Sequence, residues 1–141
     1  MGNRKVWRDA LEALEAAVHK LHVDVELTNP SQRAGRQRIV GVVVRADVMV
    51  SVFPAATLDA LGIVRERSIA LQRANGDVFQ RWTGAAIITI EGRSTIDDVI
   101  FAEPRDEVSV GWRALSGLTF RFDPSSRRLV DAGPVPAAAV A

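Results

Sequence analysis

A long apolar run at residues 39–54 contains two charged side chains. Val and Ile recur through IVGVVVRADVMVSVFP, and a β-branched run of this length predicts a buried strand rather than a helix. Arg45 and Asp47 interrupt the run two residues apart, a spacing that places both side chains on one face of a strand. Because a charge within an apolar run is costly unless it is paired or belongs to a site, we expect function to reside here.

The segment before this run predicts a helix and then a strand. Residues 4–21 are amphipathic, with apolar side chains at steps of three and four: Trp7, Leu11, Leu14, Val18 and Leu21. Two heptads are too few for an independent coiled coil, so the helix is expected to pack onto its own domain or to contribute to a dimer contact. Residues 22–28 alternate apolar and polar, which predicts a half-buried strand, and the polar residues 31–38 predict a hairpin loop.

Downstream of the central run, the pattern predicts a short helix and a hairpin. Pro54 before residues 55–60 and Gly62 after them are typical of a helix start and a helix end. Residues 68–73 and 78–90 predict strands, and Asn75–Gly76 between them favours a type I′ turn with both residues at positive φ.

The last third of the chain predicts a further strand at residues 94–102, then short strands and a helix up to about residue 130. The tail GPVPAAAVA offers nothing to pack and is expected to be disordered. We therefore predict an N-terminal helix at 1–21, one domain at 22–131 and a disordered tail at 132–141.

The amino-acid composition excludes several kinds of catalytic chemistry and binding site. The chain has 141 residues, which fits one domain, and a formal net charge of +1, which favours no highly charged partner. It contains no Cys, which excludes thiolate catalysis and disulfides, and only two His residues, so we expect no metal and no cofactor.

The sequence also argues against nucleic acid and a membrane as partners. Arg33, Arg36 and Arg38 have no aromatic residues between them, which argues against nucleic acid. No apolar run is long enough for a bilayer, and the chain is expected to be cytoplasmic, with no membrane partner.

Several motifs, in order, resemble the bacterial retropepsin-like aspartic proteases. Members of that family carry an Asp-Thr-Gly-Ala loop, a strand ending in Pro, and a short helix closed by Leu-Gly. Residues 50–54 (VSVFP) and 58–63 (LDALGI) match the latter two. Near the C-terminus, VSVG at 108–111, a helix closing at Leu118, and FRFDP at 120–124 match the family's ending. The resemblance covers residues 22–131 and implies an all-β fold, a closed barrel with short helices, assembled as a homodimer.

The resemblance also implies a site, from which the catalytic residues are missing. The Asp-Thr-Gly-Ala positions hold Arg45, Ala46, Asp47 and Val48. Aspartic proteolysis needs two carboxylates that share one proton, and an arginine cannot act as a base because its pKa stays above about 12. The hairpin around Asn75 and Gly76 would be the flap over a bound peptide, and Trp82 on its returning arm would be either core or a wall of the cleft.

Three interpretations follow. The first is a degenerate homodimer that binds a peptide or protein, with Arg45, Ala46, Val48, Asn75, Gly76 and Trp82 as contact residues, and with Arg45 and Asp47 as an ion pair. The second is an active endopeptidase in which Asp47 of each subunit is catalytic. The third is an unrelated small β interaction domain.

Overall fold

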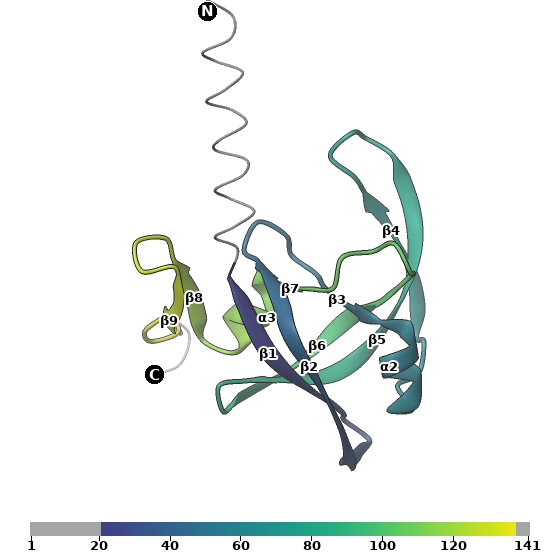
Figure 1. Ribbon diagram of the computed structural model, residues 1–141, viewed down its shortest axis with the longest axis horizontal. Helices are drawn as coiled ribbons and strands as arrows, with labels where there is room; N and C mark the ends of the chain where they lie inside the picture. The colour runs from purple at the N-terminus through teal and green to yellow at the C-terminus, as the bar shows by residue number, and fades with distance from the viewer. Residues whose placement is uncertain (1–20, 138–141) are drawn as a thin grey trace, which may run out of the picture.

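The computed structural model describes residues 21–137, and this part of the chain is mostly β, as predicted from the sequence (Figure 1). Its two short helices are α2 (Ala55–Ala60) and α3 (Trp112–Gly117). None of the helices within residues 21–137 is long and apolar enough to cross a membrane. The nine strands are β1 (His22–Asn29), β2 (Gln32–Arg45), β3 (Ser51–Pro54), β4 (Arg67–Gln72), β5 (Val78–Ile90), β6 (Arg93–Ala102), β7 (Ser109–Gly111), β8 (Phe120–Asp123) and β9 (Arg128–Asp131).

Seven strands form one sheet in the order β1-β2-β7-β3-β6-β5-β4, and β1 also pairs with β5. Most neighbours are antiparallel, but β2 pairs with β7 and β3 pairs with β6 in parallel. β7 therefore lies between two strands that are consecutive in the sequence. The connection from β2 to β3 must pass the end of β7, and this connection carries the charged residues singled out above.

The core is built from the inward faces of the strands and from one side of each helix. Phe53 of β3, Leu58 of α2 and Ile88 of β5 are fully buried. Each fully buried side chain of this size contributes about 1.5–3 kcal/mol. α2 begins after Pro54 and ends before Gly62, which has a φ of 73°, so the predicted start and end of this helix are confirmed.

β2 differs from the prediction in two respects. Residues 32–38, predicted as a polar loop, belong to this strand, because Pro30 and Ser31 alone form the turn and the polar residues pair with β1. The strand is also largely exposed rather than buried, with Val40 at 72% of its accessible surface. A strand with one solvated face tolerates polar side chains, so polarity alone did not indicate a loop.

The tip of the β4–β5 hairpin also differs from the prediction. Gly76 has a φ of 94°, whereas Asn75 is not among the residues at positive φ, so the turn is not type I′. The Arg73 N–H donates to the Asp77 carbonyl at 2.8 Å, which encloses a three-residue loop. Asn75 acts through its side chain instead, since its Oδ1 accepts the Asp77 N–H at 2.9 Å. Positive φ at two successive residues occurs at Glu91 and Gly92, between β5 and β6.

The β8–β9 hairpin forms a separate two-stranded sheet beside the first (Figure 1). Arg93 of β6 fastens it, donating to the Thr119 carbonyl at 3.0 Å and to Asp131 at 2.8 Å. Residues 132–137 follow without helix or strand. The predicted N-terminal helix, apart from Leu21, and residues 138–141 of the predicted disordered tail lie outside the described residues.

Gly111, at the end of β7, is in close contact with the β2–β3 connection. A Cβ atom at this position would lie 2.5, 2.6 and 2.7 Å from the carbonyl oxygens of Val50, Met49 and Val48. Real Cβ atoms essentially never approach backbone oxygen so closely, so only glycine fits without a shift of the loop.

We expect Gly111→Ala to lower the free energy of unfolding by about 1–3 kcal/mol, because the loop must move away from the new methyl group. Chemical denaturation followed by circular dichroism measures this change. Gly35→Ala is the matched control, since its Cβ would meet nothing nearer than Leu61 Cδ2 at 3.9 Å. Equal effects of the two substitutions would show that the close approach at Gly111 carries no constraint.

Candidate functional site

The backbone of the connection between β2 and β3, residues 46–50, is hydrogen-bonded to the start of α3. The Val48 N–H donates to the Arg45 carbonyl at 3.1 Å, which makes the first turn of the connection. The Trp112 N–H then donates to the Val48 carbonyl at 2.7 Å, and the Arg113 N–H to the Met49 carbonyl at 3.2 Å. These bonds satisfy carbonyls of the connection with the first free N–H groups of a helix. The connection is thus an ordered part of the fold.

Arg45 and Asp47 form a bidentate ion pair at the start of this connection. Arg45 Nε donates to Asp47 Oδ1 and Nη2 to Asp47 Oδ2, each at 3.0 Å. Nη1 of the same guanidinium donates to Glu107 Oε1 at 3.2 Å. The two charges predicted to share a strand face are therefore paired, but Asp47 lies in the turn after β2 rather than in a strand. The sequence did not indicate Glu107, because it lies 62 residues from Arg45.

The pairing changes the acid–base properties of both side chains. Hydrogen bonding to Arg45 lowers the pKa of Asp47 below its ordinary value, and hydrogen bonding to Asp47 raises the pKa of Arg45. A carboxylate with a lowered pKa is a weak base at neutral pH and holds no proton to donate. The Asp47 side chain is 67% exposed, so the Arg45–Asp47 pair adds at most about 1 kcal/mol to stability.

The other residues of the predicted loop are apolar. Ala46 is exposed and Val48 half-buried, and neither side chain can donate or accept a hydrogen bond. Met49 and Trp112 flank them and are 45% and 44% exposed. The loop therefore exposes the Arg45–Asp47 ion pair beside the apolar side chains of Ala46, Val48, Met49 and Trp112.

A hollow of about 910 Å³ extends from Arg45 to Arg73 and Phe79, next to the tip of the β4–β5 hairpin. Its walls come from β5 on one side and from residues 103–107 on the other. Arg81 of β5 links the two walls, because its Nε and Nη2 donate to Asp106 at 2.7 and 2.8 Å. The Asp106 side chain also accepts the Glu103 N–H at 2.8 Å. No pattern in the sequence indicates this link, since its partners are 25 residues apart and neither belongs to a motif.

Phe79 lies beside this link with a guanidinium over its ring from each of two residues. The Cζ of Arg73 is 3.8 Å from the ring centroid, and that of Arg81 is 4.6 Å from it. Cations over an aromatic face are attracted by its quadrupole, so the ring orders both side chains at the wall of the hollow.

Only some residues of the predicted flap hairpin line the hollow beside Arg45. The hairpin contributes Arg73 and Phe79 to the wall, whereas the tip residues Asn75 and Gly76 do not line the hollow. Trp82 is 48% exposed and lines a smaller, neighbouring hollow of about 230 Å³ with Arg65. Trp82 is therefore not a core residue, and its role as a wall of the cleft stays a prediction, because it does not line the hollow beside Arg45.

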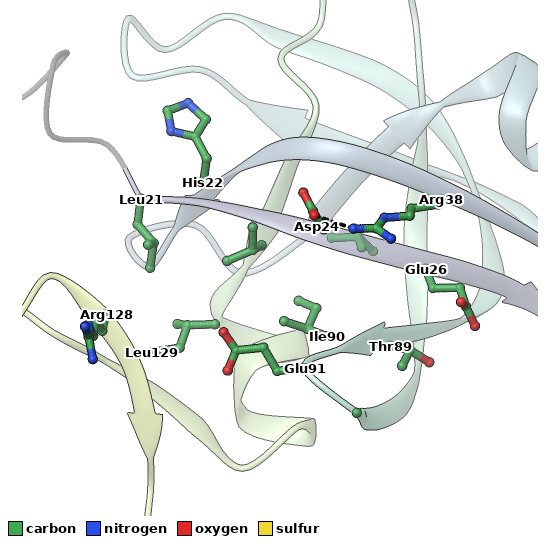
Figure 2. Close-up of a pocket in the computed structure, with 13 residues that line it drawn as sticks. Leu21, His22, Asp24, Glu26, Arg38, Thr89, Ile90, Glu91, Arg128 and Leu129 are labelled. Carbon is green, nitrogen blue, oxygen red and sulfur yellow. Dashed lines mark hydrogen bonds and ion pairs between the residues drawn. The ribbon is translucent and has the colours of Figure 1, made fainter.

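A second large hollow, of about 720 Å³, lies between β1, the β5–β6 turn and β9 (Figure 2). Its strongest polar contact is internal: Arg38 Nη2 donates to Asp24 Oδ2 at 2.6 Å, which lowers the pKa of Asp24. Ile90 and Leu129 add apolar walls. None of the residues predicted for the site lines this hollow.

Behind the candidate loop, Arg113 ties α3 to β6. Its Nε donates to Asp97 Oδ1 at 2.6 Å, and its Nη2 donates to the Asp98 carbonyl at 2.8 Å. Burial raises the pKa of Asp97, whose Oδ2 has no hydrogen-bond partner. Within residues 21–137, no three His, Asp or Glu side chains gather closely enough to hold a metal ion.

The Arg81–Asp106 pair makes a pH-dependent contribution to stability. Hydrogen bonding to Arg81 lowers the pKa of Asp106 below its ordinary value of 3.8. Because the folded-state pKa is lowered, this stabilisation is fully present above pH 3.8 and is lost as pH falls through the folded-state pKa.

We therefore expect Asp106→Asn to lower the free energy of unfolding by about 1–3 kcal/mol at neutral pH, since it leaves Arg81 without its main partner. The difference from wild type should shrink as the pH falls below 3.8. Urea denaturation over a pH series measures both. Asp59→Asn, which breaks an exposed pair with Arg65, is the control and should cost less than about 1 kcal/mol. A difference that persists undiminished at low pH would refute this assignment.

The resemblance to retropepsin-like proteases depends on the residues of this chain alone. No protein-family model matches the chain, and no curated protein matches it. Membership of that family therefore stays a prediction, and the function has to be inferred from the loop at 46–50, its ion pair and the adjoining hollow.

Proposed function

We propose that this protein is a homodimer with a retropepsin-like fold, that it is catalytically inactive, and that it binds a peptide or protein segment. The observation that carries the proposal is the ion pair of Arg45 with Asp47. It occupies the loop where the resemblance would require a carboxylate and a glycine.

The strand pairings support the fold part of the proposal. β1 pairs with β2 on one side and β5 on the other, so the order β1-β2-β7-β3-β6-β5 returns to β1, as a closed barrel requires. The predicted catalytic loop lies between β2 and β3 and rests on Gly111 and α3, which the sequence matched to the family's ending.

The chemistry of the loop supports the absence of catalysis. An aspartic protease shares one proton between two carboxylates about 3 Å apart. Here the single carboxylate of each loop, Asp47, accepts two hydrogen bonds from Arg45 and is kept ionised. A second copy would bring another ion pair, not a protonated acid. An active endopeptidase using Asp47 would have to break both pairs first.

The adjoining surface supports binding. The hollow of about 910 Å³ reaches from Arg45 to the hairpin, with a volume typical of ligand sites. Ala46, Val48 and Trp82 do not line this hollow but would add apolar contacts beside it, since the first two follow Arg45 in the chain and Trp82 lines the neighbouring hollow. The tip residues Asn75 and Gly76 would reach a bound segment only by a movement of the hairpin. An unrelated β interaction domain would use the same surface without a dimer.

We expect a dimer in which Met49 and Trp112 are buried, because both are exposed apolar side chains beside the loop that a two-fold axis would join. Sedimentation velocity at high micromolar concentration should show a dimer for wild type and a monomer for Met49→Lys with Trp112→Glu. Val40→Lys, which removes an even more exposed apolar residue from β2, should remain dimeric. A monomeric wild type would contradict the homodimer.

We expect no pepstatin-sensitive proteolysis from wild type between pH 3 and 7, measured with a fluorogenic peptide library. The fourfold variant Arg45→Asp, Ala46→Thr, Asp47→Gly, Val48→Ala should gain such activity, because it restores the carboxylate, the hydroxyl and the turn. Arg45→Asp alone should not, since Asp47 would add like charge beside the new carboxylates. Cleavage by wild type that is lost in Asp47→Asn would instead establish Asp47 as catalytic.

A further inference from the structure

The hollow beside Arg45 contains two arginines that are paired with carboxylates and two that are not. Its four guanidinium groups belong to Arg45, Arg73, Arg81 and Arg105. Arg45 binds Asp47 and Glu107, as described above. Arg81 binds Asp106 at 2.7 Å and lies 3.5 Å from Glu103. These two arginines therefore occupy four carboxylates of the neighbourhood.

The remaining two arginines face the hollow and lie more than 4 Å from any carboxylate among the described residues, although the charge of Arg73 helps to lower the pKa of Asp106. Arg73 is exposed at the end of β4 and is ordered by its stack on Phe79, 3.8 Å from the ring centroid. Arg105 is exposed in the segment between β6 and β7, on the opposite wall. The hollow thus has a cation available on each wall, whereas its carboxylates are bound to Arg45 or Arg81.

From this charge pattern we propose that the hollow selects an extended acidic peptide, with one carboxylate side chain on Arg73 and another on Arg105. The proposal rests on the peptide-binding function inferred above and adds the class of ligand. A guanidinium binds a carboxylate in a two-pronged geometry, as Arg45 and Arg81 already do here.

The same pattern disfavours nucleic acid. A polyphosphate carries a charge on every unit, so it binds best to a surface of uniformly positive sign. In this hollow Glu103, Asp106 and Glu107 lie between the arginines. A peptide whose carboxylates are spaced can meet the two available cations and avoid these three acids, whereas a continuous polyanion cannot.

The test compares two synthetic peptides by isothermal titration calorimetry with the full chain at low ionic strength. The probe is acetyl-Ala-Glu-Val-Glu-Val-Glu-Ala-amide, and its neutral counterpart has Gln in place of each Glu. We expect the acidic peptide to bind at least about tenfold more tightly, the effect of one charge-assisted hydrogen-bonded pair. Arg73→Gln and Arg105→Gln should each reduce that preference, because each removes one of the two pairs, the double variant should abolish it, and added salt should weaken it.

Arg128→Gln is the matched control, because Arg128 is an exposed arginine without an ion pair among the described residues and lies outside this hollow. It should bind the acidic peptide as wild type does. Arg105→Glu should reverse the preference at that subsite and favour a peptide with Lys in place of one Glu. All these side chains are exposed, so the variants are expected to fold, which circular dichroism checks.

Each other result overturns a defined part of the proposal. Equal binding of the acidic and neutral peptides would refute the acidic preference while leaving peptide binding in place. Binding of neither peptide would refute peptide binding itself. Tighter binding of oligothymidylate than of the acidic peptide, lost in Arg73→Gln, would assign the hollow to a polyanion instead.

Discussion

The close approach of Gly111 to the β2–β3 connection is the constraint on which the candidate site depends. Three carbonyl oxygens of the connection lie within 2.7 Å of the point that a Cβ would occupy, so the connection can follow this path only over a glycine. β7 itself is held in parallel with β2, where Gly111 pairs with Arg45. The position of the connection then places Asp47 within reach of the Arg45 guanidinium, and α3 completes the support by donating to the Val48 carbonyl.

The position of the β2–β3 connection also sets the electrostatics of the site. An arginine has five donors in a fixed fork, so one guanidinium can hold a carboxylate on two prongs and still bind another group. Arg45 does so with Asp47 and Glu107, and Arg81 does so with Asp106 and its own neighbour's carbonyl. Carboxylates held in this way have lowered pKa values and are poor proton donors. This chemistry supports the proposal that the site recognises charge rather than transfers protons.

The sequence was a good guide to elements whose pattern is local. The strands β5 and β6, helix α2 and the end of the chain through β9 agree with the expected positions within a few residues. It was a poor guide to β2, whose polar first half pairs with β1 even though its side chains are exposed. It also misassigned the turn at Asn75, because an Asn can stabilise a hairpin through its side chain without adopting positive φ.

By itself, the sequence determined that the chain is mostly β, that Arg45 and Asp47 require a partner, and that Cys chemistry is excluded. These conclusions depend on side-chain type and on spacing over a few residues, which act before any distant contact forms. Only the tertiary structure decided that Arg45 binds Glu107 as well as Asp47, that Arg81 joins Asp106 across the hollow, and that Arg105 has no ion pair among the described residues. Those pairings join residues 25 and 62 positions apart, and a distance between such residues is set by strand order and register, which no local pattern encodes.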